Sequence, residues 1–103
     1  MIIYEVRLHN LNKIIISEYN AQIIPSIDGI IRYRLFEPPD GAWIKDVEES
    51  ELSNSDSLTQ LYVCNSANIP EARQCLIDNN IAALKDKINH LETLRFIHYN
   101  NNE

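Results

Sequence analysis

The chain has 103 residues, of which 45% are hydrophobic and 23% are charged. This length corresponds to one domain, and the composition is that of an ordinary globular protein and not of a disordered chain. No apolar run approaches the ~20 residues of a membrane-spanning helix, and the first residues lack the basic and apolar regions of a signal peptide. We therefore expect one domain over residues 1–103, in the cytoplasm and without membrane contact.

The net charge of −6 arises from one segment. Residues 37–56 hold seven acidic residues and one basic residue, whereas the rest of the chain is neutral. An acidic surface disfavours direct binding to nucleic acid and favours a basic protein as partner, although acidic residues also serve solubility alone. The residues expected to bind such a partner are Glu37, Asp40, Trp43, Asp46, Glu48, Glu49, Glu51 and Asp56.

The first part of the chain reads as a hairpin. Residues 2–9 alternate between two faces, which predicts a half-buried strand with Tyr4 and Val6 toward the core. Asn residues at 10–12 favour a turn, and β-branched residues within 13–19 favour a second strand. We expect the two strands to pair in antiparallel fashion, with a separate short apolar piece at 21–24.

Further strands follow at residues 30–36 and 42–47. The turn Pro38-Pro39-Asp40-Gly41 joins them, since Pro presets the backbone and Gly permits a positive φ. Residues 48–57 are polar and acidic, which predicts an exposed loop or a helical turn. Strand character returns over residues 58–64.

Three basic residues flank this turn. Arg32, Arg34 and Lys45 could face one another across the hairpin, near Tyr33 and Trp43. The favoured interpretation is that the bases pair with acidic residues on neighbouring strands and that Trp43 packs in the core or the hairpin. The alternative is binding of single-stranded nucleic acid, for which interleaved bases and aromatic rings are typical.

The last third of the chain predicts one long helix over residues 68–95. Asn68 and Glu71 match a capping box with Pro70 in the first turn. Apolar residues then recur in one series from Ala72 and Leu76 onward, and from residue 77 to residue 91 they have the 4-3-4-3 spacing of a heptad seam. The seam, which we expect to contact a partner helix or a second copy, consists of Ile77, Ile81, Leu84, Ile88 and Leu91.

The length of this helix is itself informative. About 40 Å of helix exceeds the roughly 35 Å diameter of a compact domain of this size. Either the helix kinks near residues 78–80, or its end protrudes and packs on another chain as a homodimer. The alternative to the homodimer, and the favoured one, is a single helix that lies across one face of its own sheet. Residues 96–99 could leave the helix, and residues 100–103 are expected to fray. The predicted fold class is therefore α+β, with an antiparallel sheet of four to five strands within residues 1–66 followed by one long helix.

No pattern in the sequence points to catalysis. The chain lacks a Gly-rich phosphate loop, and Cys64 and Cys75 form no C-x-x-C pair, so both are expected to be small buried residues. The acidic residues within 46–51 could bind a divalent cation, but they lack the spacing of a calcium loop. We expect no enzymatic activity, no cofactor and no metal.

The layout resembles small phage and prophage accessory proteins, in which a few strands precede a C-terminal helix. The resemblance lies in the helix opening Asn68-Ile69-Pro70-Glu71-Ala72-Arg73 and in the stripe through Leu91. Such proteins include anti-CRISPR proteins and other inhibitors of host defence, many of them acidic and non-enzymatic. The resemblance implies the cytoplasm of a bacterial host and an inhibitor that blocks a basic, nucleic-acid-binding host protein.

Two hypotheses about function follow. In the first, residues 37–56 block a basic partner as a mimic of nucleic acid; an antitoxin or immunity protein would act in the same way on a toxin. In the second, the protein is an oligomeric structural or interaction module that acts through the helix, and the acidic segment serves solubility.

Overall fold

The computed structural model describes residues 1–39, 41–52 and 54–101, with the side chains of the last helix described as far as Arg95. Asp40 and the last two residues of the expected tail lie outside this part. The elements in chain order are β1 (Ile2–His9), β2 (Lys13–Ile24), β3 (Arg32–Phe36), β4 (Trp43–Glu48), α1 (Glu49–Leu52), β5 (Gln60–Val63), a 3-10 turn (Ser66–Asn68) and α2 (Ile69–Asn101).

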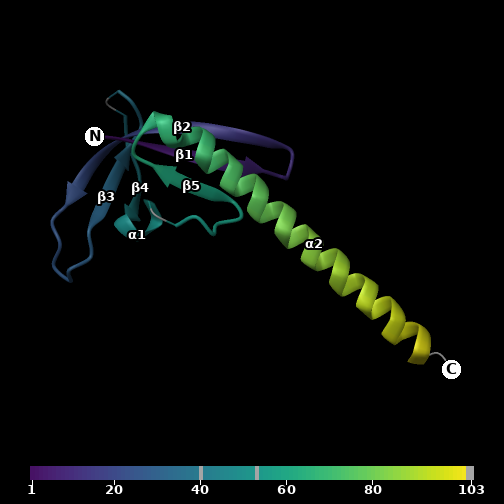
Figure 1. The fold of residues 1–103 in the computed structure, drawn as a ribbon. Coiled ribbons are helices and arrows are strands. Elements are labelled where there is room, and N and C mark those ends of the chain that lie inside the picture. The colour runs from purple at the N-terminus through teal and green to yellow at the C-terminus, as the bar shows by residue number, and fades with distance from the viewer. Residues whose placement is uncertain (40, 53, 102–103) are drawn as a thin grey trace.

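The five strands form one antiparallel sheet in the order β4-β3-β2-β1-β5, and α2 runs across it and beyond it (Figure 1). The predicted α+β class is confirmed. The strands differ from the prediction mainly at their ends: β2 is one strand of 12 residues that includes the apolar piece at 21–24.

Two turns shape the hairpins. Asn10 and Leu11 have φ angles of 53° and 59°, and the Asn12 amide donates to the His9 carbonyl over 2.9 Å, which closes the β1–β2 turn. Gly41, which was expected to supply a positive φ, does not have one. It is needed for space instead, because a Cβ there would lie 2.5 Å from Cβ of Glu37.

Both faces of β1 are buried, which corrects the prediction of a single core face. Ile3 and Val6 lie on opposite faces and are each fully buried. Ile3 belongs to a cluster with Tyr33 and Leu35, whereas Val6 packs with residues of β5 and α2. The sheet therefore separates two small cores, and Tyr4 is only half-buried.

The sheet curls strongly around the first of these cores. In a flat sheet with strands ~4.8 Å apart, β4 and β1 would be about 14 Å from each other. Nζ of Lys45 on β4 nevertheless lies 2.8 Å from Oε2 of Glu5 on β1, and it lies over the ring of Tyr62 on β5. These two contacts require the edge strands β4 and β5 to curve toward each other. α1 lies between β4 and β5 in the chain.

The first half of α2 is fastened to the sheet. Asn65, and not Asn68, caps the turn that leads into it, because its side chain accepts a hydrogen bond from the Ala67 amide. Ala72 and Leu76 then pack on β1 and β5 in the second core. Ala72 is 4% exposed and Leu76 is fully buried.

The suspected kink at residues 78–80 is absent, because α2 runs straight through them (Figure 1). These residues instead anchor the helix to the loop before β5. The Asn79 side chain donates to the carbonyls of Ser55 and Ser57, and that of Asn80 donates to the carbonyl of Leu58. The two asparagines that suggested a kink therefore hold the helix to this loop through hydrogen bonds of their side-chain amides.

Beyond this anchor the helix projects. α2 continues to Asn101 instead of ending near residue 95, so its 33 residues span about 50 Å. The radius of gyration is 18.9 Å, and the principal extents are 65 × 32 × 23 Å. A compact chain of this length would have a radius of gyration near 13 Å. The second of the two alternatives for the helix, a protruding end, is the observed one.

Candidate interaction surfaces

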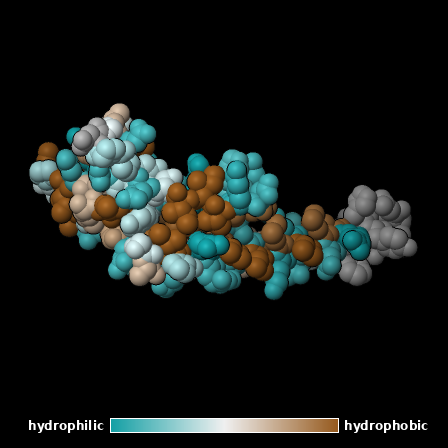
Figure 2. Space-filling model, turned by 90° about the horizontal axis from the view of Figure 1, so that it is seen from above, coloured by the Kyte–Doolittle hydropathy of each residue, from teal (hydrophilic) through white to brown (hydrophobic). Residues whose placement is uncertain are grey.

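An apolar stripe runs along the projecting part of α2. Figure 2 shows apolar side chains along the helix, continuous with an apolar patch where the helix leaves the sheet. The stripe residues expose between 38% and 63% of their surface, and every residue from Leu84 to Arg95 is exposed. The α2 stripe consists of Ile77, Ile81, Leu84, Ile88 and Leu91.

The α2 stripe is distinct from the face that packs on the sheet. Successive helix residues turn by about 100°, so Ala72 lies within about 40° of Leu76, whereas Ile77 and Leu84 lie roughly 80–100° away from it. The sequence pattern had placed Ala72 and Leu76 in one series with the later apolar positions. The structure divides them into a face that covers the sheet and a face that nothing in the described part of the chain covers.

The acidic residues are divided between four places. Glu37 lies in the turn after β3, Asp46 and Glu48 lie on β4, and Glu49 and Glu51 lie on α1. Asp56 follows in the loop before β5, and it is exposed. Because β4 is six residues long, its two ends are about 17 Å apart. Glu37 is thus separated from the acidic residues of α1.

Part of this charge is neutralised within the β3–β4 hairpin. Nε of Arg34 lies 3.3 Å from Oδ1 of Asp46, and Arg32 lies 3.8 Å from Glu48. The Trp43 indole donates to Asp46 over 2.9 Å, and its ring lies under the Arg34 guanidinium. The hydrogen bonds from Trp43 and Arg34 lower the pKa of Asp46. The favoured interpretation is therefore confirmed for the two arginines. Trp43 packs in the hairpin, as one of the two expected alternatives had it, and with 57% of its surface exposed it is not a core residue.

Arg32 has a second partner in the loop before β3. Its guanidinium makes two hydrogen bonds to Asp28, at 3.2 and 2.9 Å. These bonds lower the pKa of Asp28 to about 2. Both arginines of the hairpin thus have acidic neighbours, which disfavours a nucleic-acid surface at this face.

Lys45 lies on the opposite face of the sheet from the two arginines, contrary to the expectation that the three bases could face one another. Its Nζ pairs with Glu5, which is 4% exposed, and the hydroxyls of Tyr19 and Tyr62 also donate to that carboxylate. Burial alone raises the pKa of Glu5, but the bond and charge of Lys45 and the tyrosine bonds outweigh it, so the net pKa is lowered. Burial raises the pKa of Tyr62. This polar cluster lies against the first core, to which Tyr62 belongs.

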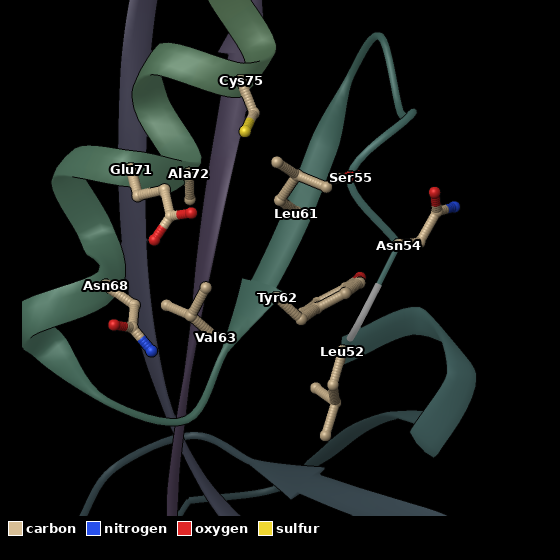
Figure 3. A pocket seen from close by; sticks show the side chains of 10 residues that line it. All are labelled: Leu52, Asn54, Ser55, Leu61, Tyr62, Val63, Asn68, Glu71, Ala72 and Cys75. Atoms are coloured by element: carbon tan, nitrogen blue, oxygen red, sulfur yellow. The ribbon is translucent and has the colours of Figure 1, made fainter.

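A small pocket lies between α2, β5 and the loop after α1 (Figure 3). Ala72 and Cys75 of α2 face Leu61 and Val63 of β5, with Glu71 at the rim. The volume of about 190 Å³ is below the roughly 300–1,000 Å³ of small-molecule and cofactor sites. The pocket has room for one side chain.

The cysteines and the possible metal ligands form no site in the described part of the chain. Both cysteines are free; Cys75 is half-buried as a packing residue, but Cys64 is exposed, contrary to the expectation of burial. Within the described residues no group of three His, Cys, Asp or Glu side chains converges as metal ligands do. No helix in the described part of the chain is long and apolar enough to cross a membrane.

No family model, no curated protein and no solved structure matches the chain.

Proposed function

We propose that the protein is a non-enzymatic interaction module that self-associates through the α2 stripe. The observation that supports this most directly is an exposed heptad seam on a helix segment that projects away from its own domain. Most of the stability of helices in proteins comes from packing of an apolar face, and no described residue packs on the stripe of this segment. A second copy of the chain would supply that packing.

Substitution on the stripe tests this function. We expect the wild type to form a dimer at about 100 µM, and Ile81→Asp to be monomeric, because the seam would then bury a charge. Ala82→Asp is the matched control: it adds the same charge to the next residue, which is also exposed but lies off the stripe. Light scattering after gel filtration measures the masses. A dimer that survives Ile81→Asp, or a wild type at 11.9 kDa, would contradict the proposal.

A second function has separate support. Glu37, Glu49 and Asp56 are exposed and form no ion pair with any described residue. With Glu51 on α1, they leave the segment acidic after its arginine pairs are formed. We propose as the second candidate that this surface blocks a basic, nucleic-acid-binding protein of a bacterial host, as inhibitors of the anti-CRISPR type do.

Charge reversal tests the second candidate. With the protein as bait in a bacterial lysate, we expect captured basic proteins to be released by salt and by competing duplex DNA, since exposed charges are screened over roughly 8 Å. Glu49→Lys should lose these proteins. Glu18→Lys makes the same charge change at an exposed position on β2 and should retain them. Equal capture by both variants would exclude the acidic surface as the contact.

A further inference from the structure

We infer that two copies of α2 pair in parallel and in register, so that both sheets lie at the same end of a two-helix coiled coil. This inference rests on the proposed self-association and adds its direction and register. Three features of α2 support it: the residue types along the stripe, the charges that flank it, and the position of its end layers.

The residue types fit a parallel pair. Since the a-to-d step of a heptad is three residues and the d-to-a step is four, the 4-3-4-3 spacing assigns the d positions to Ile77, Leu84 and Leu91, and the a positions to Ile81 and Ile88. β-branched residues at a combined with Leu at d favour two parallel strands. Both a positions and two of the three d positions follow this rule.

The flanking charges are complementary in the same arrangement. In a parallel pair, each g residue faces the e residue five positions later on the other helix. Arg73 and Lys87 occupy g, and Asp78 and Glu92 occupy e, so Arg73 would meet Asp78 and Lys87 would meet Glu92 of the second copy. All four are exposed, and none forms an ion pair within the described part of its own chain. Two-fold symmetry doubles both contacts.

The end layers disfavour the antiparallel alternative. The stripe begins and ends with a d residue, and in an antiparallel pair each a residue lies opposite a d residue. One end residue of the stripe on each helix would then lie opposite a polar a residue of the other helix, either Leu91 opposite Gln74 or Ile77 opposite Arg95. The parallel arrangement instead matches all five layers with their own copies.

Cross-linking at two positions measures the direction. In a Cys64→Ser/Cys75→Ala background, Leu84→Cys at the centre of the stripe lies beside its own copy in a parallel pair, whereas an antiparallel pair places it opposite an a residue. Leu91→Cys meets its copy only in a parallel pair, since a disulfide requires Cα atoms within about 7 Å. We expect both variants to form disulfide-linked dimers under mild oxidation, measured on non-reducing gels, with circular dichroism as the check that each is folded.

The outcomes separate the two proposals. A wild type that is dimeric while neither cysteine variant cross-links would overturn the parallel arrangement and leave self-association standing. Cross-linking of neither, together with a monomeric mass for the wild type, would overturn both.

A charge swap gives an independent result: Lys87→Glu should weaken the dimer about tenfold, and Lys87→Glu/Glu92→Lys should restore it. Asp86→Lys, an exposed change off the seam, should leave affinity unchanged. Failure of the double variant to restore affinity would contradict the register.

Discussion

The Lys45–Glu5 ion pair joins β4 to β1 and in this way supports the curled form of the sheet. The carboxylate of Glu5 has almost no exposed surface and accepts three hydrogen bonds, from Lys45, Tyr19 and Tyr62. Removing one partner of a buried ion pair leaves the other charge uncompensated, which costs more than replacing both partners with apolar groups. The pair therefore connects β4 to β1 more than it adds net stability.

A double-mutant cycle tests this account. Lys45→Met should lower the free energy of unfolding by about 2 kcal/mol, less than for a fully buried pair because a third of the Lys45 side chain remains exposed. Lys45→Met/Glu5→Leu should recover most of that loss. Urea denaturation measures both values. If the double variant is no more stable than Lys45→Met, the carboxylate is not the source of the cost.

The pH dependence provides a second check on the same pair. The pKa of Glu5 is lower in the folded state, so its contribution is present above the ordinary value of 4.5 and is lost as pH falls through the folded value. The pKa of Lys45 is raised, because its bonds to Glu5 outweigh burial, so that contribution is lost only as pH rises above 10.5. The loss of stability at acidic pH should be smaller in Glu5→Leu.

Some residues could be assigned from the sequence and others could not. The alternating pattern correctly placed Val6 in a core. It could not indicate that Glu5, on the other face, is buried as well, since its partner Lys45 lies 40 positions away in the chain. Leu11 at a positive φ was equally unexpected, because only the tertiary requirement of the turn explains it.

At the level of elements, local sequence patterns predicted whether a segment is a strand or a helix better than they predicted its first and last residues. The heptad spacing identified α2 because the pattern extends over many turns. The asparagines at 79 and 80 are unfavourable inside a helix by propensity, yet they are satisfied by carbonyls of a loop more than 20 residues earlier. Register and sheet order likewise depend on contacts that no local pattern contains.

For the whole molecule, the arrangement separates two surfaces. The acidic residues lie on β4, on α1 and in the turn and loop next to them, whereas α2 extends away from the sheet (Figure 1). Paired in parallel, two copies would present both acidic surfaces at one end of the coiled coil. A partner with two basic sites would then bind the second site at a raised effective concentration.

The central claim, that a second copy covers the α2 stripe, is tested most directly by amide hydrogen exchange of residues 84–95 at two protein concentrations. We predict slow exchange at about 100 µM and fast exchange at about 1 µM, because a helix that loses its packing opens readily. Ile81→Asp should exchange rapidly at both concentrations. Exchange of these residues in the wild type that is equally fast at both concentrations would contradict the account.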